Sequence, residues 1–296
     1  MPPASTNAGI GGVTQDYRWT WEGQPLTVVY ETLGEGTPVL LLPAFSTVST
    51  RGEMREIAQR LSSQFQVVSL DWPGFGQSAR LPLDYRSELY HQFLQDFVRT
   101  VLERPTAIVA AGHAAGYAMQ VAKQMPQSIS KIVLVAPTWR GPLPTMGVNR
   151  QLAGGVRQMV RSPLLGQGLY KLNTTPSFLR LMYKRHVYVD EAKLTPEFID
   201  QKWQITQQPG ARYAPAAFVT GAIDPVKERA DFLALFQPLS VPVTVMIGEK
   251  APPASRAEMD AISELPGVQT SVLPGSLGMH EEYGDAVAEV ILGFLS

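Results

Sequence analysis

The sequence predicts an α/β fold in which a mostly parallel central sheet has helices on both faces and is interrupted by a helical insertion. Short apolar runs alternate with amphipathic segments at spacings that suit βαβ units. The alternation stops after Pro137, and the next 85 or so residues contain helical and loop-like segments without a buried strand. Strand character then returns at residues 241–247 and 269–273, which indicates that the same sheet resumes after the insertion.

The first elements lie before residue 71. Residues 17–21 and 26–32 alternate in polarity on either side of residues 22–24, which predicts an antiparallel hairpin. Residues 39–42 form a continuous apolar run, typical of a strand that is covered on both faces. A helix over residues 53–61 follows, with its apolar side chains on one face, and then a strand over residues 66–70.

The remaining elements complete one core that is divided in two along the chain. We expect an amphipathic helix over 85–102, a buried strand over 106–111, a helix over 116–125, a strand over 131–136 and a last helix over 285–295. The predicted organisation is a first core part over residues 1–138, a helical lid over residues 139–224, and a second core part over residues 225–296.

Composition excludes several classes of protein. The chain has 296 residues and no cysteine, so disulfides, thiolate zinc sites and a cysteine nucleophile are excluded. Residues 1–12 contain no basic stretch followed by an apolar one, so we expect no signal peptide. No run of 18 apolar residues is present to span a membrane. These features lead us to expect a cytoplasmic protein.

The sequence that follows the strand at residues 106–111 carries the main functional motif. Gly112-His113-Ala114-Ala115-Gly116 precedes a helix, which is the context of the G-x-S-x-G nucleophile elbow. Glycine suits such a position because the strand-to-helix turn is too tight for most side chains. The nucleophile position of this motif holds Ala114.

Four further motifs occur in the matching order. Residues 71–78 read D-W-P-G-F-G-Q-S, residues 41–45 stand where an oxyanion loop is expected, residues 241–250 read as a late strand, and residues 281–283 form an acidic turn. Together with the elbow they resemble the α/β-hydrolase superfamily over nearly the whole chain. The resemblance implies an α/β-hydrolase fold with an inserted lid and a Ser-His-Asp triad.

The sequence departs from this family at all three triad positions. Ala114 replaces the serine, Ala251 stands at the acid position after the late strand, and Leu277 stands at the histidine position. His280 takes the histidine role instead if the loop is shifted by a few residues. These departures predict a hydrolase-like pseudoenzyme. The alternative is an esterase or lipase-like hydrolase in which serine 114 was replaced by alanine.

The elbow G-H-A-A and residues 136–144, A-P-T-W-R-G-P-L-P, also resemble a triad-deficient branch of the superfamily from cyanobacteria and plastids. This resemblance implies that Ala114 is natural and that the host is photosynthetic.

Some chemistry remains at such a site. The backbone N–H groups of Ala115 and Phe45 would form an oxyanion hole that can hold a carbonyl or carboxylate oxygen. We expect a lipophilic ligand that contacts Phe45, Ala114, Ala115, Trp72 and Trp139.

The candidate acid and base groups are His113, Asp224 and His280. The alternative for His113 is a side chain turned away from the chemistry, for Asp224 a helix cap where the lid rejoins the core, and for His280 a surface histidine. No histidine pair has metal-ligand spacing and no glycine-rich phosphate loop is present, so we expect no metal and no cofactor.

The lid is strongly basic. Residues 141–189 contain seven Lys or Arg and no Asp or Glu. On a helix over residues 150–161 the arginines fall on one side and the apolar residues on the other, namely Leu152, Val156, Met159 and Val160. Such a lid could lie on an anionic membrane, or its apolar stripe could pack on the core while the bases stay in water. A nucleic-acid partner is not expected, because no aromatic residues are interleaved for base stacking. The basic residues in question are Arg150, Arg157, Arg161, Arg180, Lys184 and Arg185.

Four functions remain open from the sequence. The first is a protein that binds a lipophilic ligand without hydrolysing it, at the periphery of a membrane. The second is a cofactor-free lyase, isomerase or oxygenase that uses the oxyanion hole with His113 or Asp224. The third is the inactivated serine hydrolase, and the fourth is a scaffold whose basic lid docks a protein partner.

Overall fold

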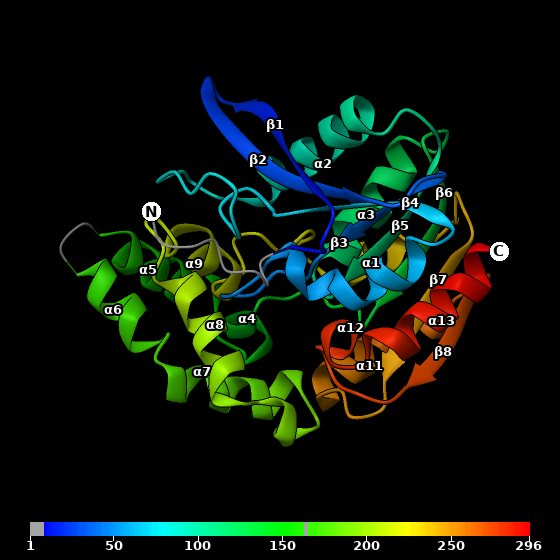
Figure 1. The fold of residues 1–296 in the computed structure, drawn as a ribbon. Helices are drawn as coiled ribbons and strands as arrows, with labels where there is room; N and C mark the ends of the chain where they lie inside the picture. Colours follow the sequence, from blue (N-terminus) through cyan, green and yellow to red (C-terminus); the bar gives the residue numbers. More distant parts are fainter. Residues whose placement is uncertain (1–8, 163–164) are drawn as a thin grey trace.

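An eight-stranded sheet forms the centre of the molecule (Figure 1). The computed structural model describes residues 9–162 and 165–296. The strand order is β1-β2-β4-β3-β5-β6-β7-β8; β1 pairs antiparallel with β2 and β2 with β4, and all other neighbours are parallel. The predicted α/β fold with a mostly parallel sheet is therefore confirmed. The strands are β1 (Val13–Trp21), β2 (Gln24–Leu33), β3 (Thr37–Leu42), β4 (Phe65–Leu70), β5 (Thr106–Ala111), β6 (Ile129–Val135), β7 (Val243–Gly248) and β8 (Val268–Leu273).

The hairpin of β1 and β2 is present as predicted, but its turn has two residues, because Gln24 belongs to β2 and not to the connection over residues 22–24. Trp21 pairs with Gln24, and the two turn residues Glu22 and Gly23 have φ values of 47° and 77°. Positive φ at both positions is the mark of a type I′ turn, whose twist matches that of the flanking strands. Both strands extend beyond the predicted limits, because exposed polar residues at their outer ends still pair.

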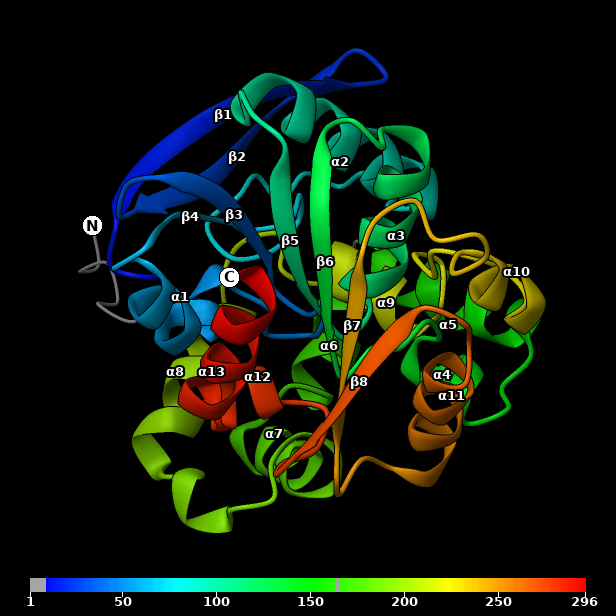
Figure 2. The same cartoon turned by 90° about the vertical axis from the view of Figure 1, so that its right-hand side faces the viewer.

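Helices cover both faces of the sheet (Figure 2). On one side α1 (Arg55–Leu61), which follows a short 3₁₀ turn η1 (Arg51–Met54), packs against α13 (Gly284–Leu295). On the other side α2 (Ser87–Val101) packs against α3 (Ala114–Gln124). Two helices that the sequence analysis missed, α11 (Pro253–Ser263) and the short α12 (Met279–Glu282), lie before and after β8.

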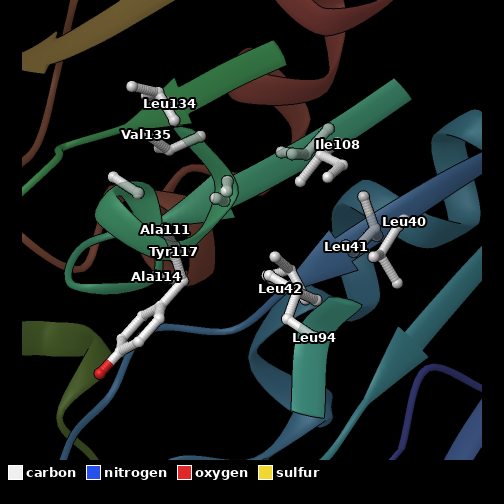
Figure 3. Close-up of a cluster of buried hydrophobic side chains, with 14 of the residues drawn as sticks. Leu40, Leu41, Leu42, Leu94, Ile108, Ala111, Ala114, Tyr117, Leu134 and Val135 are labelled. Atoms are coloured by element: carbon white, nitrogen blue, oxygen red, sulfur yellow. The ribbon is translucent and has the colours of Figure 1, made fainter. Parts of the chain in front are cut away.

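The core between these layers is apolar and closely packed. Residues 40–42 of β3 and Ile108 of β5 are fully buried, as the continuous apolar runs predict. Figure 3 shows these side chains beside Leu94 of α2, with Tyr117 extending from α3 so that its hydroxyl points away from them. This packing fixes the ends of β3 and β5, from which the candidate site is built.

A helical insertion separates β6 from β7. Side-chain caps from Asn149, Thr175 and Thr195 begin three of its helices, and proline is the first residue of two of them. Because the insertion leaves the end of β6, it starts at the edge where the parallel strands have their carboxyl ends. No helix in residues 9–162 or 165–296 is long and apolar enough to cross a membrane. The helices are α4 (Pro142–Thr145), α5 (Arg150–Arg161), α6 (Gly166–Leu172), α7 (Pro176–Met182), η2 (Tyr183–Val187), η3 (Glu191–Lys193), α8 (Pro196–Thr206) and α9 (Tyr213–Val219), followed by α10 (Arg229–Ala234).

Candidate functional site

The turn between β5 and α3 is the centre of the candidate site. β5 ends at Ala111 and α3 begins at Ala114, so Gly112 and His113 alone form the turn. Gly112 has a φ of 51°, a conformation that costs glycine little, whereas His113 has an ordinary helical φ of −68°. The expectation that Ala114 stands at the turn is therefore wrong: it is the first residue of the helix, and its side chain is fully buried.

Gly112 faces the loop that follows β3. A Cβ atom at this position would lie 3.2 Å from Cβ of Ala44 and 3.8 Å from Oγ1 of Thr138. Small residues, Ala110 and Ala114, flank Gly112 at the spacing of the G-x-S-x-G elbow. The turn thus has the form of a nucleophile elbow with glycine at its apex, and a hydrogen atom in place of a side chain cannot attack a carbonyl.

The backbone amides near the apex also differ from expectation. The N–H of Ala115 donates to the carbonyl of Gly112 at 3.2 Å, so it is not available as an oxyanion donor. Among the residues that the structure describes, the N–H groups of His113 and Phe45 donate no hydrogen bond. An oxyanion hole takes one donor from the residue after the apex and one from the loop after the first parallel strand. His113 and Phe45 occupy these two positions.

Aromatic side chains fill the space beside the turn. Phe45 stacks on Trp72 with ring centroids 4.6 Å apart, and the rings of Tyr90 and Tyr117 lie 4.9 and 5.6 Å from Phe45. All four side chains are buried. Burial raises the pKa of Tyr90 and of Tyr117 well above the ordinary value, so both phenols stay protonated near neutral pH. Phe45 and Trp72 therefore lie beside the turn as parts of a packed cluster, and their contact with a ligand stays a prediction.

Two of the side chains that were predicted to contact a ligand, Ala114 and Trp139, are buried. Ala114 has 0% of its surface exposed, which leaves no water-sized space against its side chain. Trp139 lies in other surroundings: it stacks on Phe232 of α10 with ring centroids 6.0 Å apart, and the guanidinium of Arg140 lies 4.3 Å from its ring. Among residues 9–162 and 165–296, no open apolar space therefore lies against Ala114 with Trp139 in its wall.

The structure brings two of the candidate acid and base groups together. Nε2 of His113 lies 3.1 Å from Oδ1 of Asp224, and the two side chains are 1% and 8% exposed. The same Oδ1 accepts the N–H of Gly141 at 2.8 Å, so Asp224 caps no helix and instead ties both ends of the insertion to the turn. Nδ1 of His113 is buried and has no hydrogen-bond partner in the part of the chain that the structure describes. A carboxylate that orients an imidazole is the usual support of a general base.

His280 is buried, so the alternative in which it is a surface histidine is wrong. Its Nε2 lies 3.3 Å from Oε2 of Glu53, and Nζ of Lys202 lies 2.6 Å from Glu281 and 4.0 Å from Glu53. Burial raises the pKa of the Glu53 carboxyl, against the lowering effect of His280 and Lys202. This cluster fastens α8 of the insertion to η1 and α12. No group of three or more His, Asp or Glu side chains in the described ranges could hold a metal ion.

The other two predicted triad positions carry no titratable group. Ala251 and Leu277 follow β7 and β8, and both are half-buried. The N–H of Leu277 lies 3.4 Å from the carbonyl of His186, so this loop pairs with the insertion.

The basic side chains of the insertion mostly have partners within the chain. Arg157 and Arg161 both reach Asp84, at 3.1 and 2.6 Å, and are only 18% and 25% exposed. The expectation that the bases stay in water while the apolar stripe packs on the core is therefore wrong for α5. The remaining pairs join Arg150 to Glu228 at 3.8 Å, Lys184 to Glu191 at 2.8 Å, and Arg180 to the carbonyl of Leu194.

Sequence reasoning missed a buried arginine that holds the loops around the site. Arg51 is 2% exposed, pairs with Glu31 at 2.7 Å and also with Asp71, and its backbone N–H donates to Oδ1 of Asp71 at 2.7 Å. The loop after β3 is thereby joined to the loop after β4. No sequence motif around Arg51 indicates this role. For the turn, the small residues Ala110 and Ala114 on either side of Gly112 were the pattern that could have indicated Gly112 as the apex.

Comparisons with known proteins identify the family and the fold. A model of the family described as "Alpha/beta hydrolase family" matches residues 39–290. A pimeloyl-[acyl-carrier protein] methyl ester esterase from Aeromonas salmonicida is 26% identical over 154 residues, which are 49% of this chain and 59% of that protein. An uncharacterized Mycobacterium tuberculosis protein is 31% identical over 108 residues, 36% of this chain and 31% of that protein. The chain thus matches between about a third and three fifths of the length of these relatives.

A solved structure is similar over nearly the whole chain. The crystal structure of a probable hydrolytic enzyme from Pseudomonas aeruginosa PAO1 has a TM-score of 0.75 at 16% identity, covering 97% of this chain and 95% of that one. At this identity the similarity concerns the fold alone.

Proposed function

The chain belongs to the alpha/beta hydrolase family, and from this premise we propose that it binds a lipophilic molecule through a carbonyl or carboxylate oxygen without hydrolysing it. One observation carries the proposal: the apex of the turn is Gly112. A serine hydrolase needs a side-chain oxygen there, a histidine to take its proton and an acid to orient the histidine. Gly112 offers no such oxygen, and Ala251 and Leu277 offer neither acid nor base.

The unused amides supply the binding interaction. The N–H groups of His113 and Phe45 are available to a ligand oxygen, and hydrogen bonds from such donors are strongest where water is excluded. The place that a nucleophile would fill, in front of Gly112 and between Ala44 and Thr138, is left to the ligand itself. The apolar part of the ligand would then follow these half-buried residues and would not contact Ala114.

The proposal is tested with two probes on the whole chain. Titration with the fluorescent fatty acid cis-parinaric acid measures binding, and release of p-nitrophenol from p-nitrophenyl octanoate measures hydrolysis. We expect binding without release. Gly112→Ala should weaken binding by about tenfold, because the added methyl fills the ligand position.

Gly155→Ala is the matched control, because a Cβ at Gly155 meets nothing within 4 Å. Release of p-nitrophenol by the unaltered chain would contradict the non-hydrolytic half of the proposal. Equal binding by both glycine variants would contradict the position of the ligand.

A second candidate function is proton transfer by the pair His113 and Asp224. The 3.1 Å contact, the burial and the unpartnered Nδ1 favour it. The amides would hold a carbonyl oxygen while His113 takes a proton from the neighbouring carbon, leaving the electron pair on the oxygen, and then returns the proton. Such an isomerase or lyase needs no cofactor.

The test is deuterium exchange beside the carbonyl of 2-octanone in D₂O, followed by NMR. Wild-type protein should accelerate the exchange, and His113→Gln and Asp224→Asn should both lose the acceleration. Exchange at the buffer rate with wild-type protein would remove this second candidate.

A further inference from the structure

Helix α5 presents its apolar side to solvent. Arg157 and Arg161 point inward to Asp84, and Ala153 is the one residue of α5 that is fully buried. Leu152, Val156 and Met159 lie on the opposite side and are 65%, 36% and 51% exposed. An ordinary surface helix buries its apolar stripe against the core and exposes its charges. In α5 this arrangement is reversed, so the apolar stripe is without a partner inside the described molecule.

Exposed apolar residues gather on the elements around α5. Eleven large apolar residues are strongly exposed in the part of the chain that the structure describes, and eight of them lie between residues 146 and 181. Those eight are the three on α5 together with Met146, Leu165, Leu172, Phe178 and Leu181. Figure 1 places α5, α6 and α7 on the side of the molecule away from the C-terminal helix α13. Such a concentration on one part of a surface marks an interaction site and is uncommon in a protein without a partner.

The charge of residues 141–189 indicates which kind of partner fits the exposed apolar side of α5. Residues 141–189 contain no Asp or Glu. Arg157 and Arg161 share the single carboxylate of Asp84, so this group keeps a net positive charge. Lys171 and Arg185 are exposed and form no ion pair in the described ranges. A surface that combines protruding apolar side chains with unpaired cations matches a bilayer that contains anionic lipids.

We propose that the outer face of α5 (Leu152, Val156 and Met159), with the apolar side chains of the neighbouring helices, docks the protein on an anionic lipid surface. The twelve residues of α5 lie along the bilayer plane, with the three side chains at the level of the acyl chains. Lys171 and Arg185 contact the headgroups. This docking is independent of the proposed ligand site, since it uses none of the residues around Gly112.

The test is flotation of the full chain with vesicles of phosphatidylcholine alone and of phosphatidylcholine with phosphatidylglycerol. We expect binding to the anionic vesicles and weaker binding to the neutral ones. Leu152→Ser with Met159→Ser should reduce binding by about tenfold or more. Val13→Ser with Val272→Ser is the matched control, because these residues are 69% and 50% exposed but lie on β1 and β8; this variant should bind as wild type does.

Three results would overturn the proposal. The first is that the chain binds neither kind of vesicle. The second is that both double variants bind the anionic vesicles equally well. The third is that the chain binds no vesicles but self-associates with rising concentration in sedimentation, and that the α5 variant does not self-associate. The last result would assign the face to a second copy of this chain. Circular dichroism and thermal melting of both double variants verify that each is folded.

Discussion

Replacing Arg51 by methionine should destabilise the fold by about 3–5 kcal/mol, because it leaves buried carboxylates without their cation. Arg51 is 2% exposed and lies between Glu31 at 2.7 Å and Asp71, which is fully buried. Burial raises the pKa of Glu31, but the hydrogen bond and charge of Arg51, together with the backbone N–H groups of Gly12 and Ile10, lower it by more. Glu31 is therefore ionised near neutral pH, and the guanidinium is its counter-ion.

The magnitude follows from what the methionine cannot replace. Its side chain fills a similar volume, so the loss of packing is small and the unpaired charges dominate. Arg60→Met is the matched control: Arg60 pairs with Asp285 at 3.1 Å and Glu289 at 3.6 Å, but it is 51% exposed and its partners more so. An exposed network of this kind contributes about 0–1 kcal/mol.

Urea denaturation followed by tryptophan fluorescence measures both variants against wild type. Since the free energy of unfolding of a typical domain is about 5–15 kcal/mol, the Arg51 variant should unfold at a much lower urea concentration than wild type. A loss no greater than that of Arg60→Met would refute the view that the buried arginine holds the loops after β3 and β4.

Three further predictions concern the site and its supports. Ala114→Ser should give no release of p-nitrophenol from esters, because the hydroxyl would be buried in the first turn of α3; release would revive the inactivated esterase. Gly116→Ala should cost about 1–3 kcal/mol of unfolding free energy in urea, because its Cβ would lie 2.4 Å from Cγ of Pro225; an unchanged midpoint would contradict this close approach. Lys202→Met should cost about 3 kcal/mol near pH 8 and less near pH 5. Burial raises the pKa of Glu53, so its carboxyl becomes protonated in the folded state as the pH falls. A neutral carboxyl needs no cation beside it, so the loss of Lys202 costs less at the lower pH. A loss of unfolding free energy that does not depend on pH would exclude Glu53 as the responsible group.

The sequence predicted the fold well because its signals are local. The apolar run at residues 39–42 is found in β3, and the strand predicted at 106–111 coincides with β5. The apolar pattern breaks after Pro137, and in the structure the helices α4 to α10 lie between β6 and β7. The helix α11 was missed because its residues, 253–263, carry only two fully buried apolar side chains and little periodicity.

The site was predicted less well because its geometry depends on contacts between distant segments. The motif placed Ala114 at the apex, but strand pairing ends β5 at Ala111 and moves the turn to Gly112. The pairing of His113 with Asp224 joins residues 111 positions apart, and no periodicity signals it. The orientation of α5 stayed open in the sequence for the same reason: Asp84, which pairs with its arginines, precedes α2 and is far away in the sequence.

Mass spectrometry of the protein purified from its own host tests most directly whether the chain binds a ligand at Gly112 without hydrolysing it. Spectra are recorded under native and under denaturing conditions. Non-covalent binding at Gly112 predicts a discrete small-molecule adduct in the native spectrum that is lost on denaturation. An acyl adduct that survives denaturation, or protein without any adduct in the native spectrum, would contradict it.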